Sequence, residues 1–186
     1  TMPVTGNIRI TGVNFADGFS LYSTCGGAEI ACFYSTGFFY NIPAGDYKLR
    51  AVSTASQAGN DSFSIQAFAT ATNDECANAE VITDDISTAT TINFNNPTAT
   101  QSLQSSCDTS TTEDYVDLWY EFTMPVNGNL RISGTNFADG FTVYNNCGTV
   151  PTEVDCFYGN NFTYNLPSGT YTLRVVSTAG NAGSDS

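Results

Sequence analysis

The sequence predicts an all-β protein built from tandem antiparallel β-sandwich repeats, jelly-roll-like and each about 122 residues long. The first observation behind this prediction is an internal duplication. Residues 1–19 return as 123–141, and after a two-residue insertion residues 32–54 return as 156–178. More than half of the aligned positions are identical, which indicates a tandem duplication whose two copies share one fold.

The second observation is a series of short segments in which apolar and polar residues alternate, as they do in strands with one buried face. Turn residues, the third observation, lie between these segments: Asp17-Gly18 and Asp139-Gly140, and the Pro-x-Gly corners at 43–45 and 167–169. The only helical turn expected is 73–80, capped by Asn73 or Asp74. The predicted strands are 7–11, 19–22, 38–42, 47–53, 63–68, 90–94, 116–123, 130–133, 141–144, 162–166 and 171–177.

The duplication also predicts where the repeats divide. Residues 1–72 are expected to form the C-terminal part of one β-sandwich repeat, and residues 73–186 the next repeat without its closing strand. The alternating segment 63–70 would close the first repeat, and no copy of it follows 186. We therefore expect an excerpt of a longer mature chain, or neighbouring copies that supply the missing pieces by strand addition.

Composition excludes several classes of function. The chain has five Lys and Arg and 18 Asp and Glu, so its net charge is -13. This charge disfavours binding to nucleic acids and to anionic lipid surfaces. The chain has no histidine, so the usual proton shuttle and the commonest zinc ligand are missing. No apolar run is long enough to cross a bilayer, and residues 1–4 do not resemble a signal peptide, so membrane insertion is not expected. The protein is predicted not to be an enzyme.

The six cysteines predict an oxidising, extracellular compartment. Cys25 and Cys32 correspond to Cys147 and Cys156 in the repeat. This symmetry predicts local disulfides 25–32 and 147–156, which leaves Cys76 to pair with Cys107. Zinc binding is the alternative, although the spacings are not those of a zinc knuckle.

Several of these segments together resemble a known family. The segments are 73–79 (NDECANA), 117–123 (DLWYEFT), 141–156 with its cysteine-bracketed loop, and 166–175 (LPSGTYTLRV). They resemble the β-sandwich repeats related to bacterial pre-peptidase C-terminal domains. That resemblance implies a secreted or cell-surface protein of the Bacteroidota, exported by the type IX route. It transfers no catalytic residue, and it favours a scaffold or adhesive surface.

Acidic side chains supply the candidate metal site. Asp108, Glu113, Asp114 and Asp117 place four carboxylates within ten residues, enough oxygen ligands for one calcium ion. A solvated acidic loop without any ligand is the alternative. Asp17 and Asp139 could also ligate calcium, but turn formation is the favoured role. No cofactor is required by the sequence; calcium is the one candidate.

Trp119 is the candidate binding or interface residue. Period-two alternation places it with Asp117 and Glu121 on one strand face, so it could offer a sugar platform or a subunit contact. Packing beneath a second layer or an adjoining repeat is the alternative, which we favour. Four of the five cations recur in register as the pairs Arg9/Arg131 and Arg50/Arg174, and their guanidinium groups are expected to pair carboxylates or carbonyls.

Short modification patterns complete the candidates. Asn60 and Asn161 fit the N-glycosylation pattern, while Ser62 and Thr109 follow aspartate as in the O-glycosylation sites of these bacteria. Taken together, the sequence predicts a non-catalytic structural or adhesive repeat of a cell-surface fibre, filament or adhesin stalk. Its partners would be neighbouring repeats, copies of itself or surface glycans. A carbohydrate-binding accessory module of a secreted enzyme is the alternative function, and a processing domain that accompanies a protease is the third.

Overall fold

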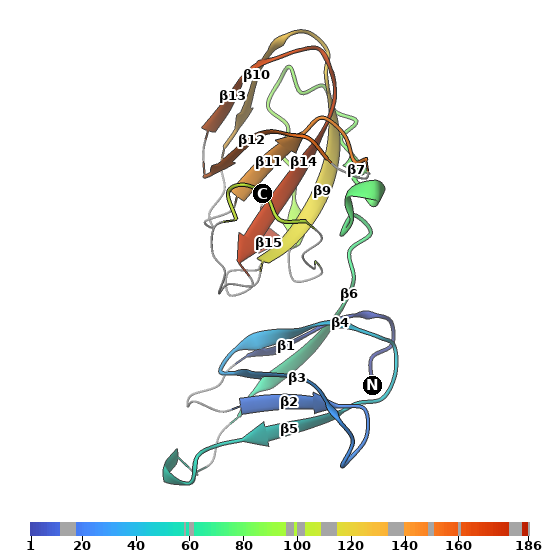
Figure 1. Ribbon diagram of the computed structural model, residues 1–186, viewed down its shortest axis with the longest axis vertical. Helices are drawn as coiled ribbons and strands as arrows, with labels where there is room; N and C mark the ends of the chain where they lie inside the picture. Colours follow the sequence, from blue (N-terminus) through green and yellow to red (C-terminus); the bar gives the residue numbers. More distant parts are fainter. Residues whose placement is uncertain are drawn as a thin grey trace. The chain divides into compact units, whose positions relative to one another are not determined.

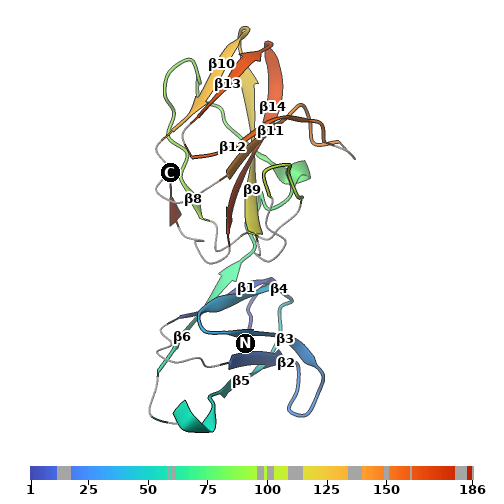
Figure 2. The same ribbon diagram turned by 60° about the vertical axis from the view of Figure 1, so that its left-hand side comes forward.

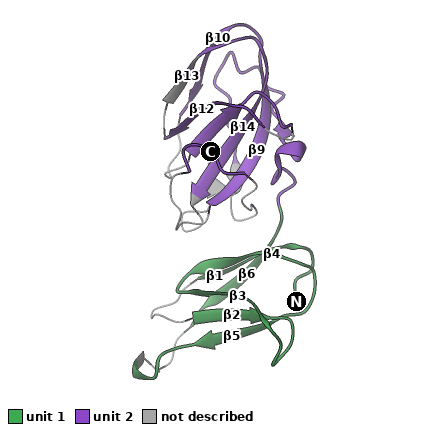
Figure 3. Cartoon of the chain, viewed as in Figure 1, with its two compact units in different colours: residues 1–70 green, residues 71–186 purple. Residues whose placement is uncertain are grey.

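The chain forms two compact units, Thr1–Thr70 and Ala71–Ser186, in the computed structural model (Figure 3). The sequence boundary was expected between 72 and 73. Each unit is described by itself below. The structure describes residues 1–11, 18–57, 59, 62–95, 99, 103–108, 115–133, 140–148, 151–159, 161–178 and 184–185.

Unit 1 is a β-sandwich of two three-stranded sheets with orders β4-β1-β6 and β3-β2-β5 (Figure 1). Its core contains side chains from both sheets, such as Ile8 and Ile10 of β1, Phe39 of β4, and Phe19 and Leu21 of β2. The core therefore lies between the two sheets. The elements are β1 (Gly6–Thr11), β2 (Gly18–Tyr22), β3 (Glu29–Tyr34), β4 (Gly37–Ile42), β5 (Lys48–Val52), the 3₁₀ turn η1 (Ala55–Gln57) and β6 (Ser64–Ala69).

Unit 2 contains a five-stranded sheet of order β12-β11-β14-β9-β7 and a separate pair, β10-β13 (Figures 1 and 2). Strand β9 is almost entirely buried on both faces, which shows that the five-stranded sheet is covered on both sides. The elements are the 3₁₀ turn η2 (Cys76–Asn78), β7 (Glu80–Val81), β8 (Phe94–Asn95), β9 (Tyr115–Met124), β10 (Gly128–Ile132), β11 (Gly140–Tyr144), β12 (Glu153–Tyr158), β13 (Asn161–Leu166), β14 (Gly169–Thr178) and β15 (Ser184–Asp185).

The two units repeat the same backbone plan. Strands β1 and β4 pair with a register shift after Gly6, and β10 and β13 pair with the same shift after Gly128. Asn41 and Asn165 both adopt positive φ, at 52° and 57°. Each donates its backbone N–H to an asparagine side chain of the strand it pairs with, Asn7 of β1 and Asn129 of β10, at 3.1 and 3.0 Å. The duplication seen in the sequence is therefore a duplication of structure.

The predicted all-β class is confirmed, and most predicted strands are present. Strands β3 and β12 were missed because apolar residues point from both of their faces, as in Glu-Ile-Ala-Cys-Phe-Tyr, so alternation gives no clear signal. The predicted strand at 90–94 is wrong for residues 90–93, and β8, the only strand there, pairs with the two-residue β15. The turn at 73–80 is η2, and its Glu75 cap makes no side-chain capping bond. Across the residues described, no helix is long and apolar enough to cross a membrane.

Candidate functional site

Two segments of unit 2, residues 73–78 and 103–108, are attached to its five-stranded sheet, and we call them the covering segments. The first begins at Asn73, whose carbonyl accepts the backbone N–H of Trp119 at 2.9 Å. The Asn73 side-chain amide donates in turn to the Trp119 carbonyl at 3.0 Å. Trp119 itself is 0% exposed, and its ring packs against Tyr144 with centroids 5.5 Å apart. Trp119 is therefore covered, as the favoured interpretation predicts, and it offers no exposed platform.

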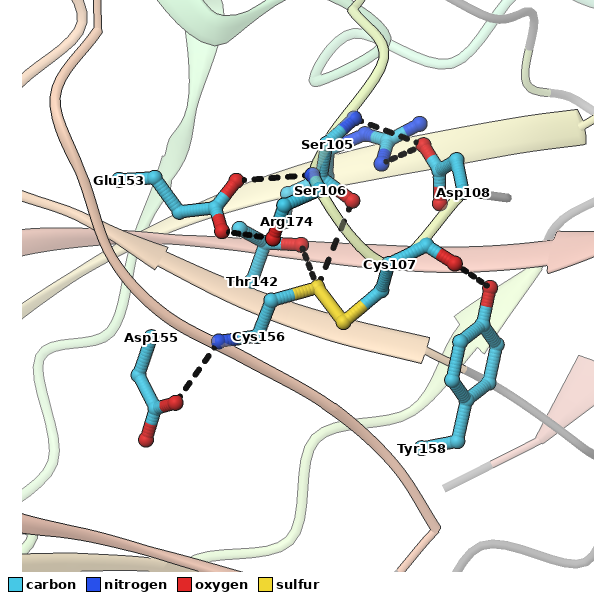
Figure 4. The surroundings of a disulfide bond; sticks show 10 residues. All are labelled: Ser105, Ser106, Cys107, Asp108, Thr142, Glu153, Asp155, Cys156, Tyr158 and Arg174. Carbon is cyan, nitrogen blue, oxygen red and sulfur yellow. Dashed lines mark hydrogen bonds and ion pairs between the residues drawn. A yellow bond between two sulfur atoms is a disulfide. The ribbon is translucent and has the colours of Figure 1, made fainter.

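The second covering segment is 103–108, which is joined to β12 through the Cys107–Cys156 disulfide and to β14 through the ion pair of Asp108 with Arg174 (Figure 4). Glu153 of β12 accepts hydrogen bonds from the backbone N–H of Ser106, at 3.0 Å, and from its hydroxyl. Tyr158 donates to the Cys107 carbonyl at 3.2 Å. Burial raises the pKa of Tyr158 to about 12, so this phenol remains a donor at neutral pH. The segment is thus held at each end of β12.

Arg174 lies at the centre of this covered face. Its Nε lies 2.6 Å from Asp117 Oδ2 and its Nη1 lies 2.6 Å from Asp108 Oδ2, and all three side chains are fully buried. Burial lowers the pKa of the guanidinium, but Asp117 and Asp108 outweigh it and hold that pKa above its ordinary value. The arginine therefore stays charged and ties the covering segment to β9 and β14.

This ion pair changes the interpretation of the predicted calcium ligands. Asp108 and Asp117 do converge on one cation, but that cation is the guanidinium of Arg174. Glu113 and Asp114 lie outside the described residues. Within the part of the chain that is described, no three His, Cys, Asp or Glu side chains are grouped as a metal would need. Of the four predicted ligands, the structure describes two, and both of these bind Arg174.

The disulfides also differ from the prediction. Cys76 pairs with Cys147 and Cys107 with Cys156, at Cα separations of 5.4 and 5.9 Å. The local pair 147–156 is wrong because the strand register places Cys156 opposite Thr142, five residues before Cys147. Five strand residues span on the order of 15 Å, whereas a disulfide needs Cα atoms within about 7 Å. Each disulfide instead fastens one covering segment to the sheet.

The same register argument applies in unit 1. Cys32 lies opposite Ser20, five residues before Cys25, so the predicted pair 25–32 is wrong as well. Both cysteines are free and exposed. Glu29 accepts hydrogen bonds from Cys32, Ser20 and Tyr22, which lower the pKa of its carboxyl group. The Cys32 thiol has a raised pKa because it bonds to Glu29 and lies close to its negative charge.

Among the residues that the structure describes, the remaining candidates do not gather at a site. Ser62 is exposed, and only the backbone of Asn161, in β13, is described. The guanidinium carbon of Arg9 lies 5.5 Å from the centre of the Phe38 ring, so this arginine stacks on an aromatic face. Four further candidates lie outside the described residues: Asp17, Asn60, Thr109 and Asp139.

Unit 2 also contains a cavity of about 640 Å³ between β10 and the five-stranded sheet. Its walls are largely apolar, from Leu130 and Ile132 on one side and Phe141 and Leu173 on the other. In unit 1 the residue equivalent to Phe141 is Phe19, and Phe63 packs edge-on against it at 5.2 Å. Phe141 thus lines a cavity in unit 2, whereas its counterpart Phe19 is covered by the Phe63 ring in unit 1.

The sequence did not identify Glu153, Ser106 or Asn73 as functional residues. Glu153 has a repeat counterpart, Glu29, which is a weak signal for a role in the fold. Asn73 and Ser106 have no counterpart in the first repeat, so the internal comparison could not mark them. Their roles depend on contacts with strands 46 and 47 residues away.

Comparison with known proteins places these features in a family. A family model described as galactose binding domain-like, for domains associated with the type IX secretion system, matches residues 1–65 and 72–186. The predicted association with type IX secretion is thereby confirmed, whereas the resemblance to pre-peptidase C-terminal domains is not. Comparison with curated proteins and with solved structures found no match.

Proposed function

Because the chain belongs to the family of galactose binding domain-like domains associated with type IX secretion, we propose that it is a non-catalytic structural or adhesive repeat of a large cell-surface protein. The observation that carries this proposal is the shared backbone plan of the two units. Strand pairing, bulge position and the positive-φ asparagine recur in both. A duplicated fold of this kind suits a protein that gains length by adding units.

The chemistry of unit 2 supports a structural role. Its buried charged side chains, Arg174, Asp108 and Asp117, bind one another and so hold segment 103–108 against the sheet. Its two disulfides join the covering segments to the sheet. A pulling force could therefore separate these segments from the sheet only if the disulfides were broken. The net charge of -13 would keep neighbouring fibres apart in solution.

Electron microscopy of the native surface protein tests this role. We expect threads or beaded chains with an axial repeat of roughly 40 Å, the length of one sandwich of short strands. An antibody against unit 2 should label the threads at regular intervals. Compact particles without periodicity would contradict the structural role.

Carbohydrate binding is the second candidate, favoured by the family's description and by the cavity of about 640 Å³. Asn129, Arg131 and Ser133 are among the residues that line it. Titration with galactose, followed by calorimetry, tests it. Binding that is lost in Arg131→Ala and retained in the matched variant Arg9→Ala would favour the carbohydrate role, and absence of heat at millimolar sugar would remove it.

A further inference from the structure

Strand β5 of unit 1 has an edge that its counterpart in unit 2 does not have. In unit 2, β14 pairs with β9 over ten residues, from Gly169 opposite Met124 to Thr178 opposite Tyr115. In unit 1 the described counterpart of this pairing is the bridge between Met2 and Gly45. Its two backbone hydrogen bonds measure 2.7 and 3.0 Å. Beyond that bridge, β5 pairs only with β2 among the residues described.

The side chains along this edge reflect the difference. Tyr171 to Ser177 of β14 are all buried, whereas four of the five residues of β5 are exposed. Val176 is 1% exposed and its counterpart Val52 is 37% exposed. The apolar side chains of β5 therefore lie at a surface that a further strand would cover, and a free edge of this kind readily accepts another strand.

Unit 1 also has counterparts of four side chains that bind the covering segments in unit 2. Cys25 and Cys32 correspond to the disulfide cysteines Cys147 and Cys156. Arg50 corresponds to Arg174, and Glu29 to Glu153. In unit 1 all four side chains are exposed, and both thiols are free.

We propose that unit 1 is an acceptor for an extended segment with the chemistry of residues 71–122. The segment adds a β9-like strand to β5 and closes two disulfides, one to Cys25 and one to Cys32. Unit 2 supplies the pattern of contacts. There Cys76 meets Cys147, Cys107 meets Cys156, and two aspartates meet the arginine.

The register of unit 1 fits this occupant. Met2 already lies against Gly45 as Met124 lies against Gly169, so a strand that ends beside Thr1 would run along β5 as β9 runs along β14. The incoming carboxylates equivalent to Asp108 and Asp117 would then face Arg50. Opposite charge at that point favours this register over a slipped one.

The covalent step is an ordinary dithiol oxidation. Each thiol of unit 1 loses one proton and one electron, as does the incoming thiol, and one S–S bond forms. A disulfide oxidant such as oxidised glutathione takes up the two electrons and two protons and leaves as two thiols. Docking would also free Cys32 from Glu29, because the equivalent Glu153 bonds to Ser106 of the covering segment instead.

The test uses the full chain, with the disulfides of unit 2 intact, and a synthetic peptide of residues 71–122. The two are incubated in a glutathione redox buffer and mapped by mass spectrometry without reduction. We expect a one-to-one adduct in which peptide Cys76 joins Cys25 and peptide Cys107 joins Cys32. A peptide carrying Cys107→Ser should couple only to Cys25, and one carrying Cys76→Ser only to Cys32.

A non-covalent arm separates docking from thiol reactivity. A peptide carrying both serine substitutions should still bind the chain in calorimetry. Arg50→Ala, or Asp117→Asn in the peptide, should weaken that binding by about tenfold or more, because each leaves an unpaired charge at the contact. A scrambled peptide of the same composition is the control. The proposal is overturned by a Cys25–Cys32 bond, by unselective coupling, by attachment to Cys147 or Cys156, or by equal binding of the scrambled peptide.

Discussion

Arg174 and Arg50 occupy the same position in two copies of one fold, yet one is fully buried and the other exposed. What differs is the covering layer, which gives Arg174 two buried carboxylates, whereas the exposed Arg50 lies near the exposed carboxylate of Glu29. The sequence correctly predicted that this arginine pairs a carboxylate. It could not identify Asp108 as a partner, because 66 residues separate the two and no local pattern joins them.

The contrast predicts different costs for the same substitution. Arg174→Ala leaves Asp108 and Asp117 buried without their cation, so we expect the free energy of unfolding of unit 2 to fall by about 3–5 kcal/mol. Arg50→Ala, the matched control at an exposed site, should cost less than about 1 kcal/mol. Denaturant unfolding monitored by Trp119 fluorescence, a signal from unit 2, measures the first, and circular dichroism of the whole chain measures the second. Equal costs would contradict the assigned geometry.

Glu29 and Cys32 predict a pH-dependent reactivity. The Glu29 carboxylate raises the pKa of the Cys32 thiol, so less thiolate is present at any pH below that value. Glu29→Gln should therefore accelerate alkylation of Cys32 by iodoacetamide between pH 7 and pH 9. Alkylation of Cys25, followed in the same samples by mass spectrometry, serves as the internal reference. An unchanged ratio of the two rates would show that Glu29 does not act on Cys32.

At the scale of elements, strands with one buried face were predictable and the covering segments were not. Segment 103–108 has no strand or helix period, and its position comes from Glu153 and Cys156 of β12 and from Arg174 of β14. The disulfide pairing failed for a related reason. Symmetry suggested that repeated cysteines pair with each other, whereas in unit 2 the repeated cysteines each hold a segment that precedes the repeated part.

The disulfides predict a stability difference between the units. In the chain-entropy model, closing loops of 71 and 49 residues contributes about 4 kcal/mol each. The double variant Cys107→Ser/Cys156→Ser should therefore lower the stability of unit 2 by about 2–4 kcal/mol. The matched double variant Cys25→Ser/Cys32→Ser should leave the thermal midpoint unchanged, because those thiols are free. A loss of stability in the second variant would mean that Cys25 and Cys32 are bonded in solution.

At the scale of the whole molecule, the duplication and the β-sandwich class followed from the sequence alone. Identity between the repeats extends to the asparagine at positive φ and to the proline carbonyls that accept from Tyr47 and Tyr171. The sequence did not predict that the covering segments of unit 2 pack on its sheet. These segments have no counterpart in the first repeat, so comparison of the repeats could not relate them to the strands that they contact. Trp119 lies in the interior, as the favoured alternative predicts, whereas Asp108 and Asp117, which the sequence offered as ligands of a calcium ion, are buried around Arg174.

The central claim is that long-range disulfides hold the covering segments on the sheet of a structural repeat. Single-molecule stretching of the chain tests this claim most directly. A chain carrying Cys25→Ser and Cys32→Ser would be stretched from its ends before and after reduction. The Cys76–Cys147 bond hides 71 residues, so reduction should add about 240 Å to the fully unfolded length, at about 3.4 Å per residue. A gain of only about 140 Å, which is what the local pairs Cys147–Cys156 and Cys76–Cys107 would together hide at the same length per residue, would contradict the account.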